Sequence, residues 1–195
     1  MKYFNSLLAA AALIGGLIVF SSCKGGGNKV EEAAEEEVCE ISVPTVEETA
    51  FDYMAEVFGS QYAPGEYCIP CGTIVAKDES NPEDIRLWGD YWVFIYNKEG
   101  DLLKMVSGGS HPGLMHLCKT DGEYKVTGFE GVVDGAGNLE SAKAIFGEHY
   151  DAFHAINSDA PAREKVRCDA VSAFVKAAGM DVKGYQDYGW DPVLF

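Results

Sequence analysis

Hydrophobic positions between residues 45 and 58 recur three or four residues apart, which is the spacing of one helical face. The apolar side chains on that face are Val46, Ala50, Tyr53, Met54 and Val57. Thr45 followed by Glu48 forms a capping box, and Gly59 is typical of a helix end. The pattern therefore predicts a helix that begins after Thr45 and ends at Gly59.

The middle of the chain has the pattern of β-strands. Runs rich in β-branched and aromatic residues predict a short strand at 72–77 and longer strands at 85–97, 101–107, 113–119 and 123–130. Glycine-containing connections at 97–101 and 120–122 are typical of hairpins, and the sequence GGSHPG at 108–113 is expected to reverse the chain. These segments together predict an antiparallel β-meander of four or five strands.

The run at 91–96 is apolar on both faces of its strand. Trp92, Phe94 and Tyr96 point to one side, because side chains alternate along a strand, and the residues between them point to the other. An exposed sheet face would alternate apolar with polar residues, so this strand is expected to be central. Helices would cover one side, and a pocket, another subunit or the C-terminal tail would cover the other.

Helical spacing returns after the strands. One helix is expected over 138–156, and a second begins after Asp159 as N-cap, with Pro161 in its first turn and Gly179 at its end. The side chains expected to be buried on the second helix are Val166, Ala170, Phe174 and Ala177. The last stretch has no period but carries several aromatic residues, which we expect to dock on the domain because they would be a liability in water.

This order of elements predicts an α+β fold. An N-terminal helix packs on a curved antiparallel β-meander of four to five strands, followed by two C-terminal helices and a docked aromatic tail. The element order over 45–130 is similar to the cystatin-like and nuclear-transport-factor-2-like folds. That resemblance implies a helix lying in the curve of a strongly bent antiparallel sheet.

The N-terminus has the features of an export signal. Lys2 precedes an apolar run at 7–20 that is too short to span a bilayer but fits the h-region of a signal peptide. Ser21 and Ser22 stand before Cys23, and this ending resembles the bacterial lipoprotein signal, which implies acylation of Cys23. An ordinary secreted protein is the alternative. Three regions are expected: a signal peptide at 1–22, a flexible acidic tether at 23–44 and a single domain at 45–195.

Three stretches, SGGSHPGLMHL, SAKAIFG and YQDYGWDPV, resemble small lipoproteins of Bacteroides-type gut bacteria. The resemblance implies a location in the cell envelope and no particular activity. The lipid bilayer would be a partner through acylated Cys23, with the outer membrane facing the periplasm as the expected site and surface exposure left open. With 31 acidic and 15 basic side chains, a net charge of −16, the chain is not expected to bind nucleic acid.

The cysteines offer the first candidate chemistry. If Cys23 is acylated, five remain, an odd number, so at least one is free or paired between molecules. They are Cys39, Cys68, Cys71, Cys118 and Cys168. The sequence CIPC at Cys68 and Cys71 is a redox candidate, but a strand-like stretch follows it where redox enzymes place a helix. A structural pair that steadies a loop is favoured over a redox pair.

Other candidate sites are weaker. His116 and Cys118 share a strand face, but no four-ligand spacing accompanies them, and the sequence indicates no cofactor. Ser110 beside His111 lacks the strand–turn–helix context of a hydrolase nucleophile. Asp187 and Asp191 on both sides of Trp190, and Glu130 with Asp134 just past the strands, could serve a small-ligand site, but a docked tail with solvated acids is favoured.

No catalytic constellation is assembled, so a non-catalytic protein is favoured. The expected function is a membrane-anchored envelope lipoprotein whose domain binds a protein partner or small ligand. The expected binding residues are Trp92, Phe94, Tyr96 and Trp190. Two alternatives stay open: a tethered thiol–disulfide protein that uses Cys68 and Cys71, and a homodimeric structural component of the envelope.

Overall fold

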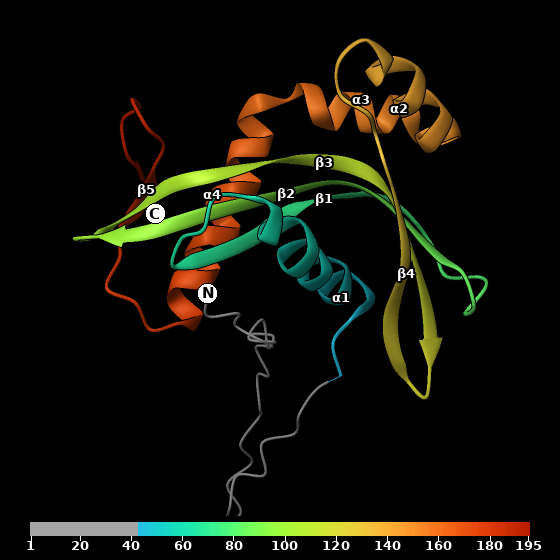
Figure 1. The fold of residues 1–195 in the computed structure, drawn as a ribbon, viewed down its shortest axis with the longest axis horizontal. Helices are drawn as coiled ribbons and strands as arrows, with labels where there is room; N and C mark the ends of the chain where they lie inside the picture. The colour runs from blue at the N-terminus through green and yellow to red at the C-terminus, as the bar shows by residue number, and fades with distance from the viewer. Residues whose placement is uncertain (1–42) are drawn as a thin grey trace, which may run out of the picture. The chain divides into compact units, whose positions relative to one another are not determined.

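The computed structural model describes residues 43–195, so the expected signal peptide and all but the end of the expected tether lie outside the described residues. The described part is an α+β unit in which helices cover both faces of one sheet (Figure 1). Helix α1 (Val46–Tyr53) is followed by a π-helical turn at Met54–Phe58 and a short 3₁₀ turn. The capping box is confirmed, because Thr45 Oγ1 accepts from the Glu48 amide at 3.2 Å and the Thr45 amide donates to Glu48 Oε2 at 2.7 Å.

Six strands form the sheet. They are β1 (Tyr67–Asp78), β2 (Ile85–Glu99), β3 (Leu102–Thr120), β4 (Glu123–Gly131), β5 (Gly184–Gln186) and β6 (Val193–Leu194). Strands β1 to β4 pair antiparallel in chain order, which confirms the predicted meander except that the strands expected at 101–107 and 113–119 are one strand, β3. The aromatic tail adds β5 and β6, with β5 parallel to the first residues of β3. The strand that carries 91–96 is therefore central, as expected.

The predicted chain reversal at 108–113 is wrong. Strand β3 continues through this segment, and its residues pair in unbroken register with β2 from Phe94 opposite Gly108 to Asp90 opposite Pro112. A Cβ atom on Gly108 would lie 2.4 Å from the backbone oxygen of Val93. The glycine is required for close approach of two strands rather than for a turn.

The two faces of the sheet have separate cores. The face under α1 packs Val46, Ala50 and Met54 against side chains from β2 and β3, and those buried strand residues are Ile85, Leu87, Tyr91, Val93, Ile95, Met115 and Leu117. The opposite face packs against the C-terminal helices in two clusters, which centre on Tyr96 and Trp88. Figure 1 shows α1 on one side of the sheet and α4 on the other.

The C-terminal helices differ in detail from the prediction. The helix expected over 138–156 is two, α2 (Asn138–Phe146) and α3 (Tyr150–Ser158), because Gly147 adopts a positive φ of 51° and a 3₁₀ turn separates them. Helix α4 (Ala160–Ala177) follows, with Asp159 as its N-cap as predicted. No helix among the described residues is long and apolar enough to cross a membrane.

The buried stripe of α4 is not the expected one. It consists of Arg167, Val171 and Val175, one position along from the predicted face. The first of these residues is charged, so the spacing of apolar residues alone does not identify the buried stripe. The tail docks as expected through Tyr185, which is 1% exposed, but Tyr188 is 98% exposed.

Candidate functional site

The face of β2 that was expected to bind a partner is covered by α4. Two arginines one helical turn apart on α4 lie over alternate aromatic residues of β2. Residues i and i+4 share one face of a helix, and residues i and i+2 share one face of a strand, so the two pairs can meet. The Arg163 guanidinium carbon is 4.7 Å from the Trp92 ring centroid, and that of Arg167 is 4.1 Å from the Phe94 centroid. These cation–π contacts are strong where water is excluded.

Arg167 joins the sheet, α4 and the tail. Its Nε donates to the Tyr96 hydroxyl at 3.0 Å, and its terminal nitrogens donate to both carboxylate oxygens of Asp187, one of them at 2.7 Å. The residue is only 6% exposed. Burial disfavours the charged guanidinium, but the Asp187 and Tyr96 hydrogen bonds outweigh it and raise the pKa of Arg167. The tail is therefore fixed to the core by a fully paired buried cation.

Asp90 is the centre of a second polar cluster on this face. Its carboxylate is fully buried and accepts from Trp92 Nε1 at 2.8 Å, Ser110 Oγ at 3.0 Å and Asn157 Nδ2 at 3.2 Å. Arg163 Nε lies 3.3 Å from Asp90 Oδ2. One carboxylate thus holds β2, β3, the end of α3 and the start of α4 together.

A pocket of about 390 Å³ lies beside this cluster. Residues from β1, α3 and α4 line it, namely Thr73, Ala155, Ile156, Asp159, Ala162, Arg163 and Val166. The lining is mostly carbon, and the guanidinium of Arg163 already faces Asp90. The pocket can accept a small apolar group, but it presents no nucleophile next to a base.

The residues expected to bind a partner divide into buried and exposed sets. Trp92 is 2% exposed and Tyr96 is fully buried, while Phe94 is partly buried beneath Arg167. A partner cannot reach the two buried rings while α4 is in place, because α4 covers this face of β2. The apolar pattern of the strand had indicated that some segment would cover it. Trp190 is 75% exposed and remains available.

Trp190 lies on a hairpin whose base is held to the core. The Trp190 amide donates to the Asp187 carbonyl at 3.2 Å, and Gln186 Nε2 donates to the Trp190 carbonyl at 2.5 Å. Gly189 takes a φ of 81°, which the turn between them requires. The hairpin presents Tyr188 and Trp190 to solvent while Asp187 at its base binds Arg167.

The cysteine pair of CIPC lies in a strand rather than a loop. Because β1 is extended there, Cys68 faces the π-helical turn after α1, where its Sγ donates to the Ala55 carbonyl at 3.6 Å, and Cys71 faces α4. Burial raises the pKa of Cys68 to about 11 and that of Cys71 to about 12. Two protonated thiols on opposite faces of a strand lack the geometry of a redox pair.

The metal candidates His116 and Cys118 contact neighbouring side chains of the domain. His116 Nδ1 is 2.7 Å from Asp84 Oδ1, and its Nε2 is 3.1 Å from Glu130 Oε1. Cys118 accepts only a long contact from Thr120 Oγ1. Within residues 43–195, no group of three or more His, Cys, Asp or Glu side chains could hold a metal ion, and the four cysteines there are free.

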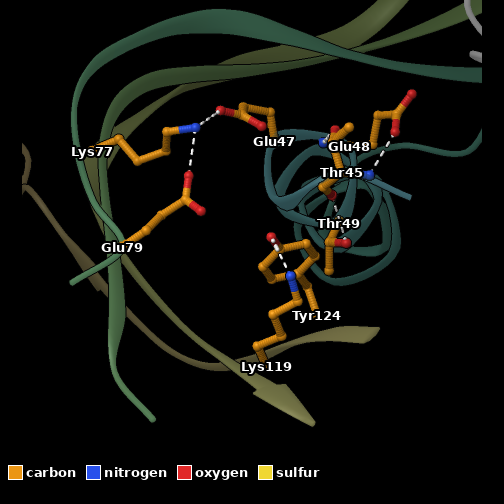
Figure 2. Close-up of polar contacts among 8 residues, drawn as sticks. All are labelled: Thr45, Glu47, Glu48, Thr49, Lys77, Glu79, Lys119 and Tyr124. Carbon is orange, nitrogen blue, oxygen red and sulfur yellow. Dashed lines mark hydrogen bonds and ion pairs between the residues drawn. The ribbon is translucent and has the colours of Figure 1, made fainter. Parts of the chain in front are cut away.

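A polar cluster marks the start of the domain (Figure 2). Lys77 Nζ lies 2.7 Å from Glu47 Oε1 and 2.6 Å from Glu79 Oε1, so it links α1 to the end of β1. Lys119 Nζ donates to the Tyr124 hydroxyl at 3.2 Å and lies over the same ring. These contacts border a hollow of about 380 Å³ and fix the first turn of α1 against the sheet.

Comparisons with protein-family models, with curated protein sequences and with solved structures found no match to this chain.

Proposed function

We propose that this chain is a membrane-anchored bacterial envelope lipoprotein whose domain binds a protein partner or small ligand without catalysis. One observation carries the proposal: the C-terminal hairpin exposes Tyr188 and Trp190 while Arg167 fixes its base. Large exposed aromatic side chains on a fixed support are typical of binding anchors, because little conformational entropy is lost when they are covered.

The binding residues proposed here differ from those expected from the sequence, but the proposed class of function is the same. Both faces of the sheet are covered by the chain's own helices, so the hairpin replaces the sheet face as the contact surface. Leu194 and Phe195 extend the exposed apolar surface beside it, at 65% and 45% exposure. The Asp187 carboxylate is paired with Arg167, but that of Asp191 is exposed beside the aromatic pair and favours a ligand with hydroxyl or cationic groups.

The membrane anchor in this proposal is acylated Cys23. The sequence before it has the h-region and the small residues of a lipoprotein signal, and the acidic stretch that follows provides a spacer. Feeding cells a clickable palmitate analogue should label the wild-type chain and leave Cys23→Ser unlabelled. An unlabelled wild-type chain would remove the anchor from the proposal without affecting the binding surface.

The binding surface is tested by cross-linking partners to the full-length chain in intact cells. The double substitution Tyr188→Ala with Trp190→Ala is expected to lose at least about 90% of the specific cross-links, because it removes the anchor rings. Leu139→Ala is the matched control, since Leu139 is also apolar and exposed but lies on α2. A cross-linking pattern that is the same in the double variant and the wild type would refute the hairpin as the binding site.

A further inference from the structure

We propose that the unpaired middle of β3 is a binding site for an extended peptide of the partner, added to the sheet as a strand beside the aromatic hairpin. This inference rests on the proposed function and specifies the chemical class of the partner. The outer edge of β3 pairs with β5 at Leu102, Leu103 and Lys104, and with β4 from Gly113 onward. Between these contacts, residues 105–112 pair with β2 alone, apart from one bond at Pro112.

The direction of the open backbone groups follows from that one bond. The Val132 amide donates to the Pro112 carbonyl at 2.9 Å, so the carbonyl of Pro112 points to the outer edge. Backbone groups alternate sides along a strand, and the register with β2 has no break between Gly108 and Pro112. Gly108 and Ser110 therefore direct their N–H and C=O groups to the same open edge, where an added strand could form about four hydrogen bonds.

Between the bulge at Val106 and Pro112, this edge lacks the features that normally prevent strand addition. Edge strands are usually protected by charged residues, proline or bulges, and the opposite edge strand, β1, carries Pro70, Lys77 and Asp78. Residues 106–111 read VSGGSH and contain no Asp, Glu, Lys or Arg. Glycine there leaves the backbone open to an approaching chain, and the single bulge, at Val106, lies at one end.

The two ends of the open edge indicate what the peptide carries. At one end, β5 runs parallel to β3 and turns away at Asp187, so that Tyr188 and Trp190 lie where an added strand would begin. Asp191 follows the aromatic pair. At the other end, Asp134 lies close enough to His111 to act on its pKa.

Asp191 and Asp134 are exposed, and neither is in an ion pair among the described residues. The site thus fits an extended peptide with an uncharged centre and Lys or Arg at its ends. Figure 1 shows this stretch of β3 between the C-terminal hairpin and the chain leaving β4.

The test pans random peptides displayed on phage against the full chain in detergent micelles. Selected peptides are expected to have basic ends and to slow amide hydrogen exchange at Gly108 and Ser110. Ser110→Pro should weaken their binding at least about tenfold, because proline removes an outward donor. Ser110→Ala removes the same hydroxyl but keeps the amide, and should bind as the wild type does. Peptides N-methylated at alternate residues should also lose binding.

Three results would overturn the proposal. Panning could enrich no peptide over the bare micelle, or selected peptides could bind Ser110→Pro and Ser110→Ala equally. Bound peptides could also slow amide hydrogen exchange at other residues and not at Gly108 and Ser110. Light scattering that shows a dimer with the same amides protected would assign the edge to a second copy instead. When one of these results overturns strand addition, loss of the cross-links in the Tyr188 and Trp190 double variant still supports the hairpin as the contact surface, so the failure of one proposal is distinguishable from the failure of the other.

Discussion

The two faces of the sheet are both covered by helices but are held by different interactions. Under α1 the contacts are apolar: Met54 and Leu87 are fully buried, and the Tyr91 hydroxyl donates within its own strand to the Leu87 carbonyl. Under α4 the contacts are charged and directional, because Arg163 and Arg167 lie on aromatic rings and pair with carboxylates.

The difference shows what each face can tolerate. Apolar packing is non-directional, so an apolar face accepts changes of shape at a cost set by the cavity left behind. A buried cation needs its partners in fixed positions, and removing one leaves the others desolvated and unpaired. The α4 face therefore fixes the register of helix, strand and tail, which the α1 face does not do.

The largest expected effect is loss of the cation on the α4 face. Arg167→Ala should lower the free energy of unfolding by about 4 kcal/mol, because Asp187 and the Tyr96 hydroxyl lose their partner. Met54→Ala on the α1 face should cost about 3 kcal/mol through a cavity. Urea denaturation of the full chain measures both.

The two variants should differ in the tail. Arg167→Ala should release the hairpin, which lowers the fluorescence anisotropy of Trp190, and Met54→Ala should leave it fixed. A Trp190 signal that is the same in both variants would show that the tail does not depend on Arg167. Lys165→Ala, in an exposed pair on α4, is the control and should change stability by less than about 0.5 kcal/mol.

The second prediction uses one thiol on each face. The raised pKa values of Cys68 and Cys71 reduce the thiolate at pH 8 by roughly a hundredfold and a thousandfold relative to an ordinary cysteine. Alkylation by iodoacetamide, followed by mass spectrometry, should be slow at both in the folded protein and slowest at Cys71. Rapid formation of a Cys68–Cys71 disulfide by mild oxidant would contradict the opposed geometry.

The smallest effect concerns His116, on the same face as the arginines. Burial disfavours its charged form, but hydrogen bonds to Asp84 and Glu130 outweigh this and raise the pKa of His116. The contribution of His116 to the free energy of unfolding is then complete below about pH 6.5. It is lost as the pH rises through the folded-state pKa of His116. The stability difference between wild type and His116→Gln should shrink by under about 1 kcal/mol from pH 5.5 to about pH 8.5.

A substitution that removes no titratable group is the control. Leu139→Ala changes an exposed side chain on α2, and its stability difference from the wild type should not change over the same pH range. A His116→Gln difference that grows as the pH rises would reverse the assigned sign.

Local patterns predicted the elements, and long-range contacts decided the rest. The capping box at Thr45 and the cap at Asp159 depend on neighbours in sequence, so both were predictable. The continuity of β3 was not, because GGSHPG has the composition of a turn and only the approach of β2 explains its glycines. A strand apolar on both faces correctly indicated a cover, but periodicity does not say which segment provides it.

The candidate site was hardest to predict because its main residues violate the apolar pattern. Arg163 and Arg167, four positions apart, look like a solvated helix face until the aromatic rings opposite are known. Asp90 carried a usable signal, since a lone acid before an apolar strand run requires a buried donor or cation. The exposure of Trp190 depends on how the hairpin turns, which composition does not encode.

The burial of Asp90 has a consequence for biogenesis. Two of the groups that surround its carboxylate, Trp92 and Ser110, come from β2 and β3, but Asn157 and Arg163 are near the C-terminus. A chain whose last third has not yet emerged leaves this acid without its cation, so the native sheet is disfavoured until synthesis is almost complete. Such a delay keeps the polypeptide unfolded during synthesis, which is the state that the export proposed above requires.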